Sequence, residues 1–164
     1  MRHANKAKHL YELADKEWSR GHMRAAFRLF LAAAKAGNPS AFGIVAQFYD
    51  FGDGVKFNEQ TALYWYLRAY RHGDTAVANN IGCILRDQNR LKAALQWFYR
   101  AVTHGDADAN LEIGRIYLHR KRDPKTATRY LNAVCKAKNA LEQSKELASE
   151  LLNGIRSHLY APRP

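Results

Sequence analysis

The chain has 164 residues, of which 47% are hydrophobic, and it carries a formal net charge of +11 at pH 7. This content suffices for one domain with a continuous core, and no stretch approaches the roughly 18 apolar residues of a membrane span. Acidic side chains between Glu12 and Glu17 interrupt the N-terminal segment, which argues against a secretory signal. The sequence therefore predicts a cytoplasmic protein without a membrane partner, and its charge favours acidic partners.

A small residue followed by large ones recurs in register along the chain. Four aligned alanines are separated by 36, 32 and 33 residues, a period typical of stacked repeat units. These alanines are Ala26, Ala62, Ala94 and Ala127, and the large pairs that follow them are Leu29–Phe30, Trp65–Tyr66, Trp97–Phe98 and Tyr130–Leu131. Offsets of three and four residues place these side chains on one face of a helix. An earlier apolar and small pair indicates a preceding helix in each unit: Leu13–Ala14, Val45–Ala46, Ile81–Gly82 and Ile113–Gly114.

Each unit is therefore interpreted as a helical hairpin, and turn residues separate the units. The Gly52–Gly54 segment breaks the second unit, and Gly37, Gly73 and Gly105 end the second helices of the first three. The predicted units are residues 9–37, 38–73, 74–105 and 106–139, followed by a capping helix at 140–158 within one domain of residues 1–160, and a loose tail at 161–164. The predicted fold is all-α, a right-handed α/α superhelix of about four hairpins with a C-terminal capping helix.

The small residues of the first helices have an expected packing role. A glycine inside a helix costs about 1 kcal/mol relative to alanine, so a close approach between helices must compensate. We expect Gly82 and Gly114 to allow that approach, with the rings of Trp65 and Trp97 filling the adjacent gaps.

The second unit carries the motifs of a known family. Its Gly52-Asp53-Gly54-Val55 loop is followed by Ala62-Leu63-Tyr64-Trp65-Tyr66-Leu67-Arg68-Ala69 and Gly73, and Ile81–Gly82 and Ile113–Gly114 match the family's Leu-Gly pair. Over about residues 9–139 the chain resembles the Sel-one-like repeat family, which is related to the tetratricopeptide repeats. The first and fourth units depart from the pattern, because Leu29–Phe30 and Tyr130–Leu131 replace its Trp-Tyr pair.

The resemblance implies a bacterial adaptor for protein–protein contacts, and one version of this role is an immunity protein that neutralises a cognate toxin. If the units stack as in tetratricopeptide arrays, the first helices line a concave groove. The partner-binding residues predicted for this concave face are Tyr11, Asp15, Trp18, Gln47, Asp50, Phe51, Asn79, Arg86, Arg115 and Leu118. Mixed aromatic and arginine chemistry is typical of interface hot spots. For Tyr11 and Trp18, completion of the N-terminal core is an equally open interpretation.

A short basic run predicts a secondary patch for acidic proteins or phosphates: His119, Arg120, Lys121 and Arg122. The sequence favours an exposed, solvated loop as the interpretation of this run, because charge runs usually mark exposed turns. The alternative function is a nucleic-acid-binding protein that uses the basic excess of the first and fourth units, although acidic residues are interspersed and no nucleic-acid motif is present.

Nothing in the sequence supports catalysis. It contains no phosphate loop, zinc motif or nucleophile elbow, and Cys83 and Cys135 lack the spacing of a disulfide framework or metal site. We therefore expect a non-enzyme without cofactor, metal or small-molecule substrate.

Overall fold

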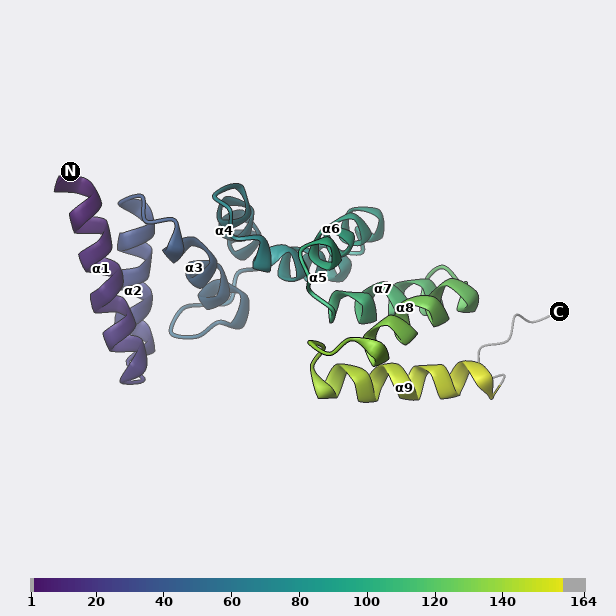
Figure 1. Ribbon diagram of the computed structural model, residues 1–164. Helices are drawn as coiled ribbons and strands as arrows, with labels where there is room; N and C mark the ends of the chain where they lie inside the picture. The colour runs from purple at the N-terminus through teal and green to yellow at the C-terminus, as the bar shows by residue number, and fades with distance from the viewer. Residues whose placement is uncertain (1, 158–164) are drawn as a thin grey trace. The chain divides into compact units, whose positions relative to one another are not determined.

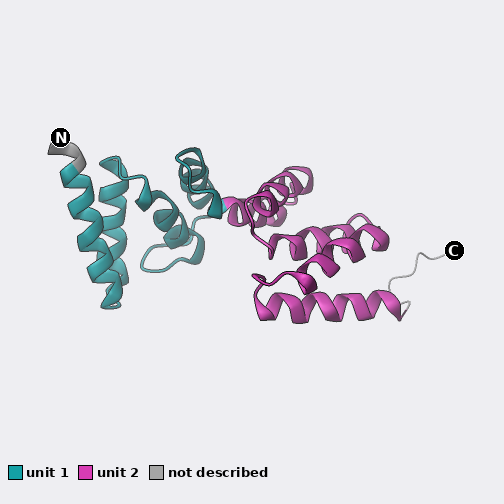
Figure 2. Cartoon of the chain, in the orientation of Figure 1, with its two compact units in different colours: residues 1–77 teal, residues 78–164 magenta. Residues whose placement is uncertain are grey.

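The computed structural model describes residues 2–157, and the side chains of residues 5–157. Every regular element in that range is helical (Figure 1). The chain divides into two compact units, Met1–Val77 and Ala78–Pro164 (Figure 2). The loose tail predicted at 161–164 lies outside the described residues.

Unit 1 consists of two helical hairpins. The first pairs α1 (Arg2–Ser19) with α2 (Met23–Lys35), and the second pairs α3 (Ser40–Phe51) with α4 (Glu59–Arg71). A 3-10 turn, η1 (Thr75–Val77), completes the unit.

Unit 2 repeats the arrangement and adds a single helix. Its hairpins are α5 (Ala78–Asp87) with α6 (Leu91–Thr103), and α7 (Ala109–His119) with α8 (Pro124–Lys136). The final helix, α9 (Glu142–Arg156), packs on α8 through Ala148 and Leu152. The predicted all-α fold of four hairpins and a C-terminal helix is confirmed for the described residues.

The repeated positions form the core of both units. Ala26, Ala62, Ala94 and Ala127 are fully buried, as are Phe30, Tyr66, Phe98 and Leu131. The first unit differs in its first helix, where Leu13 is 38% exposed and its neighbour Ala14 is fully buried. Helix α1 therefore turns its small side chains, rather than Leu13, toward the core.

The helical glycines allow close approach, but their partners are not the predicted ones. A Cβ added to Gly82 would lie 2.6 Å from the ring of Phe98, and one added to Gly114 would lie 2.8 Å from Leu131. The expectation that tryptophan rings fill these gaps is wrong, because the residue after each tryptophan position faces the glycine. Trp65 and Trp97 instead lie beneath Arg68 and Arg100, with 4.8 Å and 4.4 Å between guanidinium carbon and ring centroid.

The Gly52–Gly54 segment ends α3 and contacts α2. Gly52 has the left-handed conformation that closes a helix (φ 75°), and its amide donates to the carbonyl of Phe48. Gly54 also has a positive φ of 66°, and an added Cβ would lie 2.8 Å from the backbone of Met23 and Arg24. The loop therefore passes directly over the first turn of α2.

Helix α4 begins with a side-chain cap that we expect to be worth about 1 kcal/mol. The amide of Thr61 donates to Oδ1 of Asn58 at 3.0 Å, which satisfies one of the unpaired amides of the first turn. Asn58→Ala should lower the free energy of unfolding by about that amount, whereas Asn58→Asp keeps an acceptor and should cost little. Urea unfolding of the two variants tests this, and an equal loss in both would contradict it.

Candidate functional site

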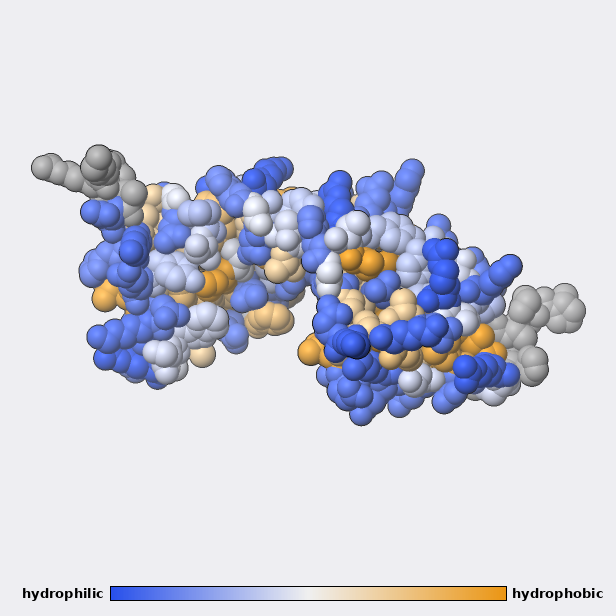
Figure 3. Space-filling view, viewed as in Figure 1, coloured by the Kyte–Doolittle hydropathy of each residue, from blue (hydrophilic) through white to orange (hydrophobic). Residues whose placement is uncertain are grey.

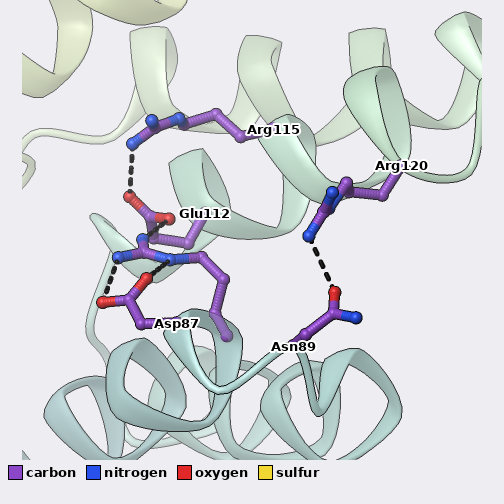
Figure 4. A network of polar contacts seen from close by, with 6 residues as sticks. Asp87, Asn89, Glu112, Arg115 and Arg120 are labelled. Atoms are coloured by element: carbon purple, nitrogen blue, oxygen red, sulfur yellow. Dashed lines mark hydrogen bonds and ion pairs between the residues drawn. The ribbon is translucent and has the colours of Figure 1, made fainter.

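Charged side chains from the two hairpins of unit 2 form one network (Figure 4). Arg86, at the end of α5, donates from Nε to Oδ1 of Asp87 at 2.8 Å and from Nη2 to Oδ2 at 3.2 Å. Its Nη1 also donates to Oε2 of Glu112 on α7. Arg115, one turn along α7, donates to the other oxygen of Glu112 at 3.1 Å. Glu112 thus bridges two arginines that come from different hairpins.

The arginines of this network differ in how firmly they are held. Burial disfavours the charged form of Arg86, but its hydrogen bond with Asp87 and the charge of Glu112 outweigh burial and raise its pKa above the usual value. The Arg86 side chain is 28% exposed, against 45% for Arg115. Arg86 is therefore a fixed charge of the site, and Arg115 is its more accessible neighbour.

A third arginine joins the site from the loop after α7. Nη2 of Arg120 donates to Oδ1 of Asn89 at 2.7 Å, which links this loop to the α5–α6 turn (Figure 4). Asn89 has a positive φ of 59°, a conformation that asparagine tolerates better than most residues. The turn thus places a neutral acceptor, rather than a carboxylate, beside Arg120.

These residues line a groove on unit 2, which we call the arginine groove. It has a volume of about 300 Å³ and is lined by Arg86, Asp87, Leu91, Glu112, Arg115, Ile116, His119 and Arg120. Its lining includes the apolar side chains of Leu91 and Ile116. A site of this composition can bind carboxylates through guanidinium groups and apolar atoms through its aliphatic side chains.

The arginine groove combines residues from the two separately predicted sites. Arg86 and Arg115 were predicted for the concave face, and His119 and Arg120 for the basic patch. Lys121 and Arg122 are exposed but do not line the groove. The basic run is therefore divided, because α7 ends at His119 and the chain turns away after Arg120.

On unit 1 the structure brings together three other residues predicted for the concave face. Trp18, Gln47 and Phe51 line a second pocket, of about 220 Å³. The Trp18 ring also packs edge-on against Phe30, with 5.8 Å between centroids, so it serves both the core and this pocket. The ring of Tyr11 packs against Phe30 at 5.3 Å and does not line the pocket.

The remaining predicted residues have other positions. Asp50 accepts a hydrogen bond from the hydroxyl of Tyr66 at 3.0 Å, Asp15 is exposed on α1, and Oδ1 of Asn79 is buried without a partner among the described residues. Leu118 is only 4% exposed, which removes its side chain from the candidate surface. It lies four residues after the buried Gly114 and therefore on the core face of α7.

The acidic members of the groove were missed by the sequence reasoning. Glu112 stands three residues before Arg115, a spacing that brings two side chains together on a helix, so this partner could have been found. Its second contact, with Arg86, joins residues 26 positions apart and depends on how the two hairpins pack. No sequence pattern indicated that Asp87, Leu91 and Ile116 would line a candidate site.

The described residues hold neither a cluster of metal ligands nor a helix that could span a membrane. No group of three or more histidine, cysteine, aspartate or glutamate side chains in that part of the chain could hold a metal ion. Among the helices from Arg2 to Arg156, none has the length and apolar character needed to cross a membrane.

Paired antiparallel helices with a repeated core pattern define a helical-repeat protein. The Sel1 repeat matches residues 23–38, 44–74, 81–106 and 107–139. These segments cover more than half of the chain, which therefore belongs to the Sel1 repeat family. Helix α1 lies outside the matched segments. No curated protein sequence matches the chain.

Solved structures share this fold. A protective antigen of uropathogenic Escherichia coli with an SLR fold is 14% identical over 93% of this chain, with a TM-score of 0.64. A Sel1 repeat protein from Oxalobacter formigenes is 23% identical over 94%, with a TM-score of 0.62. The chain spans 38% of the length of the first protein and 74% of the second. An immunity protein from Pseudomonas aeruginosa is 20% identical over 79% of this chain and 52% of its own, with a TM-score of 0.49.

Proposed function

We propose that the chain is a non-enzymatic adaptor that binds an acidic segment of a partner protein in the arginine groove. The observation that carries this proposal is the convergence of Arg86, Arg115 and Arg120, from two hairpins, beside Leu91 and Ile116. Guanidinium groups hold carboxylates with charge-assisted, often bidentate hydrogen bonds. Arginine is also enriched at the hot spots of protein interfaces.

The three arginines have different roles in this proposal. Arg86 is already bound to Asp87 and Glu112, so it supports the site rather than supplying a free charge. Arg115 shares Glu112 and is the more exposed of the two. Arg120 bonds a neutral amide, and a carboxylate from a partner would give it a stronger, charge-assisted bond. Arg115 and Arg120 are therefore the proposed contacts.

The composition of the groove favours a protein over a nucleic acid. Leu91 and Ile116 place apolar side chains in the lining, and these can pack against the side chains of a protein segment but not against a phosphate backbone. Lys121 and Arg122, whose charges would otherwise assist phosphate binding, lie outside it. The immunity role is a narrower form of the same proposal, in which the partner is a toxin held inactive. That role and the cytoplasmic location stay predictions.

Reversal of the two accessible arginines tests the proposal. The full chain is immobilised as wild type, as Arg115→Glu/Arg120→Glu, and as the control Lys136→Glu/Lys138→Glu, which has the same change in charge at exposed positions outside the groove. Proteins captured from a lysate of the source organism are then identified. We expect a partner that the wild type and the control retain and that the arginine variant loses, with a fall in affinity of about a hundredfold or more.

Two further measurements decide between the alternatives. Nuclease treatment should leave the capture unchanged, and a synthetic acidic segment of the partner should compete with it. Loss of capture after nuclease treatment would instead favour the nucleic-acid function. Equal losses in the two charge-reversed variants would show that the overall charge, rather than the arginine groove, attracts the partner. Circular dichroism establishes that all three proteins are folded.

A further inference from the structure

Unit 1 has a pocket of a different chemistry, which the proposed function does not use. It is lined by Trp18 from the last turn of α1, by Ile44, Gln47, Phe48 and Phe51 from α3, and by Asp53 from the loop that follows. We call it the aromatic pocket. The space-filling view shows apolar surface set among hydrophilic side chains on both units (Figure 3).

Ring contacts hold part of the aromatic pocket in place. Phe48 is 4% exposed and contacts Phe30, with 6.0 Å between ring centroids. The Trp18 ring packs on the same two residues, at 6.2 Å from Phe48. Trp18 is nevertheless 39% exposed and Phe51 is 67% exposed. Core packing therefore fixes Trp18 and Phe48, and Phe51 leaves a large apolar surface open to solvent.

The volume limits what can enter the pocket. Pockets for drug-sized ligands have volumes of roughly 300–1,000 Å³, whereas the aromatic pocket has about 220 Å³. It is thus suited to one bulky apolar side chain of a partner. Anchors of this kind, inserted between aromatic walls, contribute much of the binding energy at protein interfaces.

The charge of the pocket determines which residue the partner can carry next to the inserted apolar side chain. Asp53 is the charged residue of the lining, and no ion pair of the described residues engages it. Asp53 therefore places a negative charge beside an exposed aromatic surface in a chain of net charge +11. It favours a cation and opposes phosphate groups, anionic lipid and the acidic segment proposed for unit 2.

We propose that the aromatic pocket is a second docking site, for a partner segment in which a Phe, Leu or Met side chain lies next to a Lys or Arg. The apolar side chain inserts between Trp18 and Phe51, and its basic neighbour pairs with Asp53. This site is independent of the arginine groove, since it lies on the other unit and selects the opposite charge. The adaptor then has two sites that distinguish partners by the sign of their charge.

Selection of short random peptides on the immobilised full chain tests this second site. We expect recovery of peptides with an aromatic or aliphatic residue beside Lys or Arg. Phe51→Ala should weaken their binding about tenfold or more. The matched control is Phe57→Ala, because Phe57 is an aromatic residue of similar exposure, 57%, that does not line the pocket. Binding that is equal in the wild type and Phe51→Ala would overturn the proposal.

A charge reversal tests the role of Asp53 separately. Asp53→Lys should exclude the basic peptides and accept versions in which Glu replaces their Lys or Arg. Glu150→Lys, with the same charge change at an exposed position of α9, should not. Peptides that keep their basic preference with Asp53→Lys would overturn the assignment. Recovery of acidic peptides alone, lost with Arg115→Glu/Arg120→Glu, would support the arginine groove and overturn this second site.

The chain's own residues also have to be tested as the occupant. Leu159, Tyr160 and Arg163 have chemistry similar to the proposed segment. The selection is therefore repeated on a full-length Leu159→Ser/Tyr160→Ser variant. Equal recovery from this variant and the wild type supports a partner as the occupant. Recovery from the variant alone would overturn that choice, because the chain's own segment would then fill the pocket.

Discussion

Gly54→Ala is expected to lower the free energy of unfolding of unit 1 by about 2–4 kcal/mol. Two effects add at this position. The positive φ of 66° disfavours any residue with a Cβ, at a cost of about 1–2 kcal/mol. The new Cβ would also lie 2.8 Å from the backbone of Met23 and Arg24. Backbone atoms cannot move aside as a flexible side chain can, so the loop must separate from the first turn of α2.

Gly52 provides the matched control for Gly54. It has a similar φ of 75°, but an added Cβ would make only ordinary contacts, from 3.4 Å upward. Gly52→Ala should therefore cost only the conformational part, about 1–2 kcal/mol, and Gly52→Asn still less. Urea unfolding gives the free energies, and hydrogen exchange in the first turn of α2 gives the local effect. Equal losses for the two alanine variants would show that the contact with α2 adds nothing.

Phe98→Ala is expected to destabilise unit 2 by about 3–5 kcal/mol, the range for a fully buried aromatic side chain. The Phe98 ring also occupies the space where Gly82 would carry a Cβ, 2.6 Å away. Gly82→Ala alone should therefore be destabilising, because overpacking costs about 1–3 kcal/mol. The higher helix propensity of alanine opposes this loss by roughly 1 kcal/mol and does not outweigh it. The side chain that can be accommodated at position 82 therefore depends on the side chain at position 98.

A double-mutant cycle isolates that dependence. In the Phe98→Ala background the clash is absent, so Gly82→Ala should become neutral or stabilising. The expected coupling is about 1–3 kcal/mol, typical of side chains in contact. Thermal or urea unfolding of the four proteins measures it. Additive effects would mean that the ring of Phe98 moves aside, and the glycine would then need another explanation.

The fold was predictable from the sequence because its causes are local. Alanines and large side chains at helical spacing predicted the buried stripes, and all four aligned alanines are fully buried. The choice between Trp97 and Phe98 as the partner of Gly82 was not predictable, since adjacent residues on a helix differ only in the direction of the side chain. That direction depends on how the two helices of the hairpin are rotated against each other.

The candidate site was less predictable because it joins different elements. The bond between Arg86 and Glu112 requires the packing of the α5–α6 hairpin against α7 to be known. Leu118 was assigned to the concave face, although its spacing of four residues from Gly114 places it on the core face of α7. Asp53 belongs to a loop motif that was interpreted by its glycines, and the position of its carboxylate depends on the fold of that loop.

The double engagement of Arg86 affects how any substitution of this residue has to be interpreted. Its guanidinium group separates Asp87 from Glu112, so Arg86→Ala would leave both acids without their shared cation. The lining would then contain two arginines and two acids in place of three and two. Loss of partner binding with Arg86→Ala would therefore reflect a neutralised surface and the mutual repulsion of Asp87 and Glu112. It would not identify Arg86 as a residue that contacts the partner.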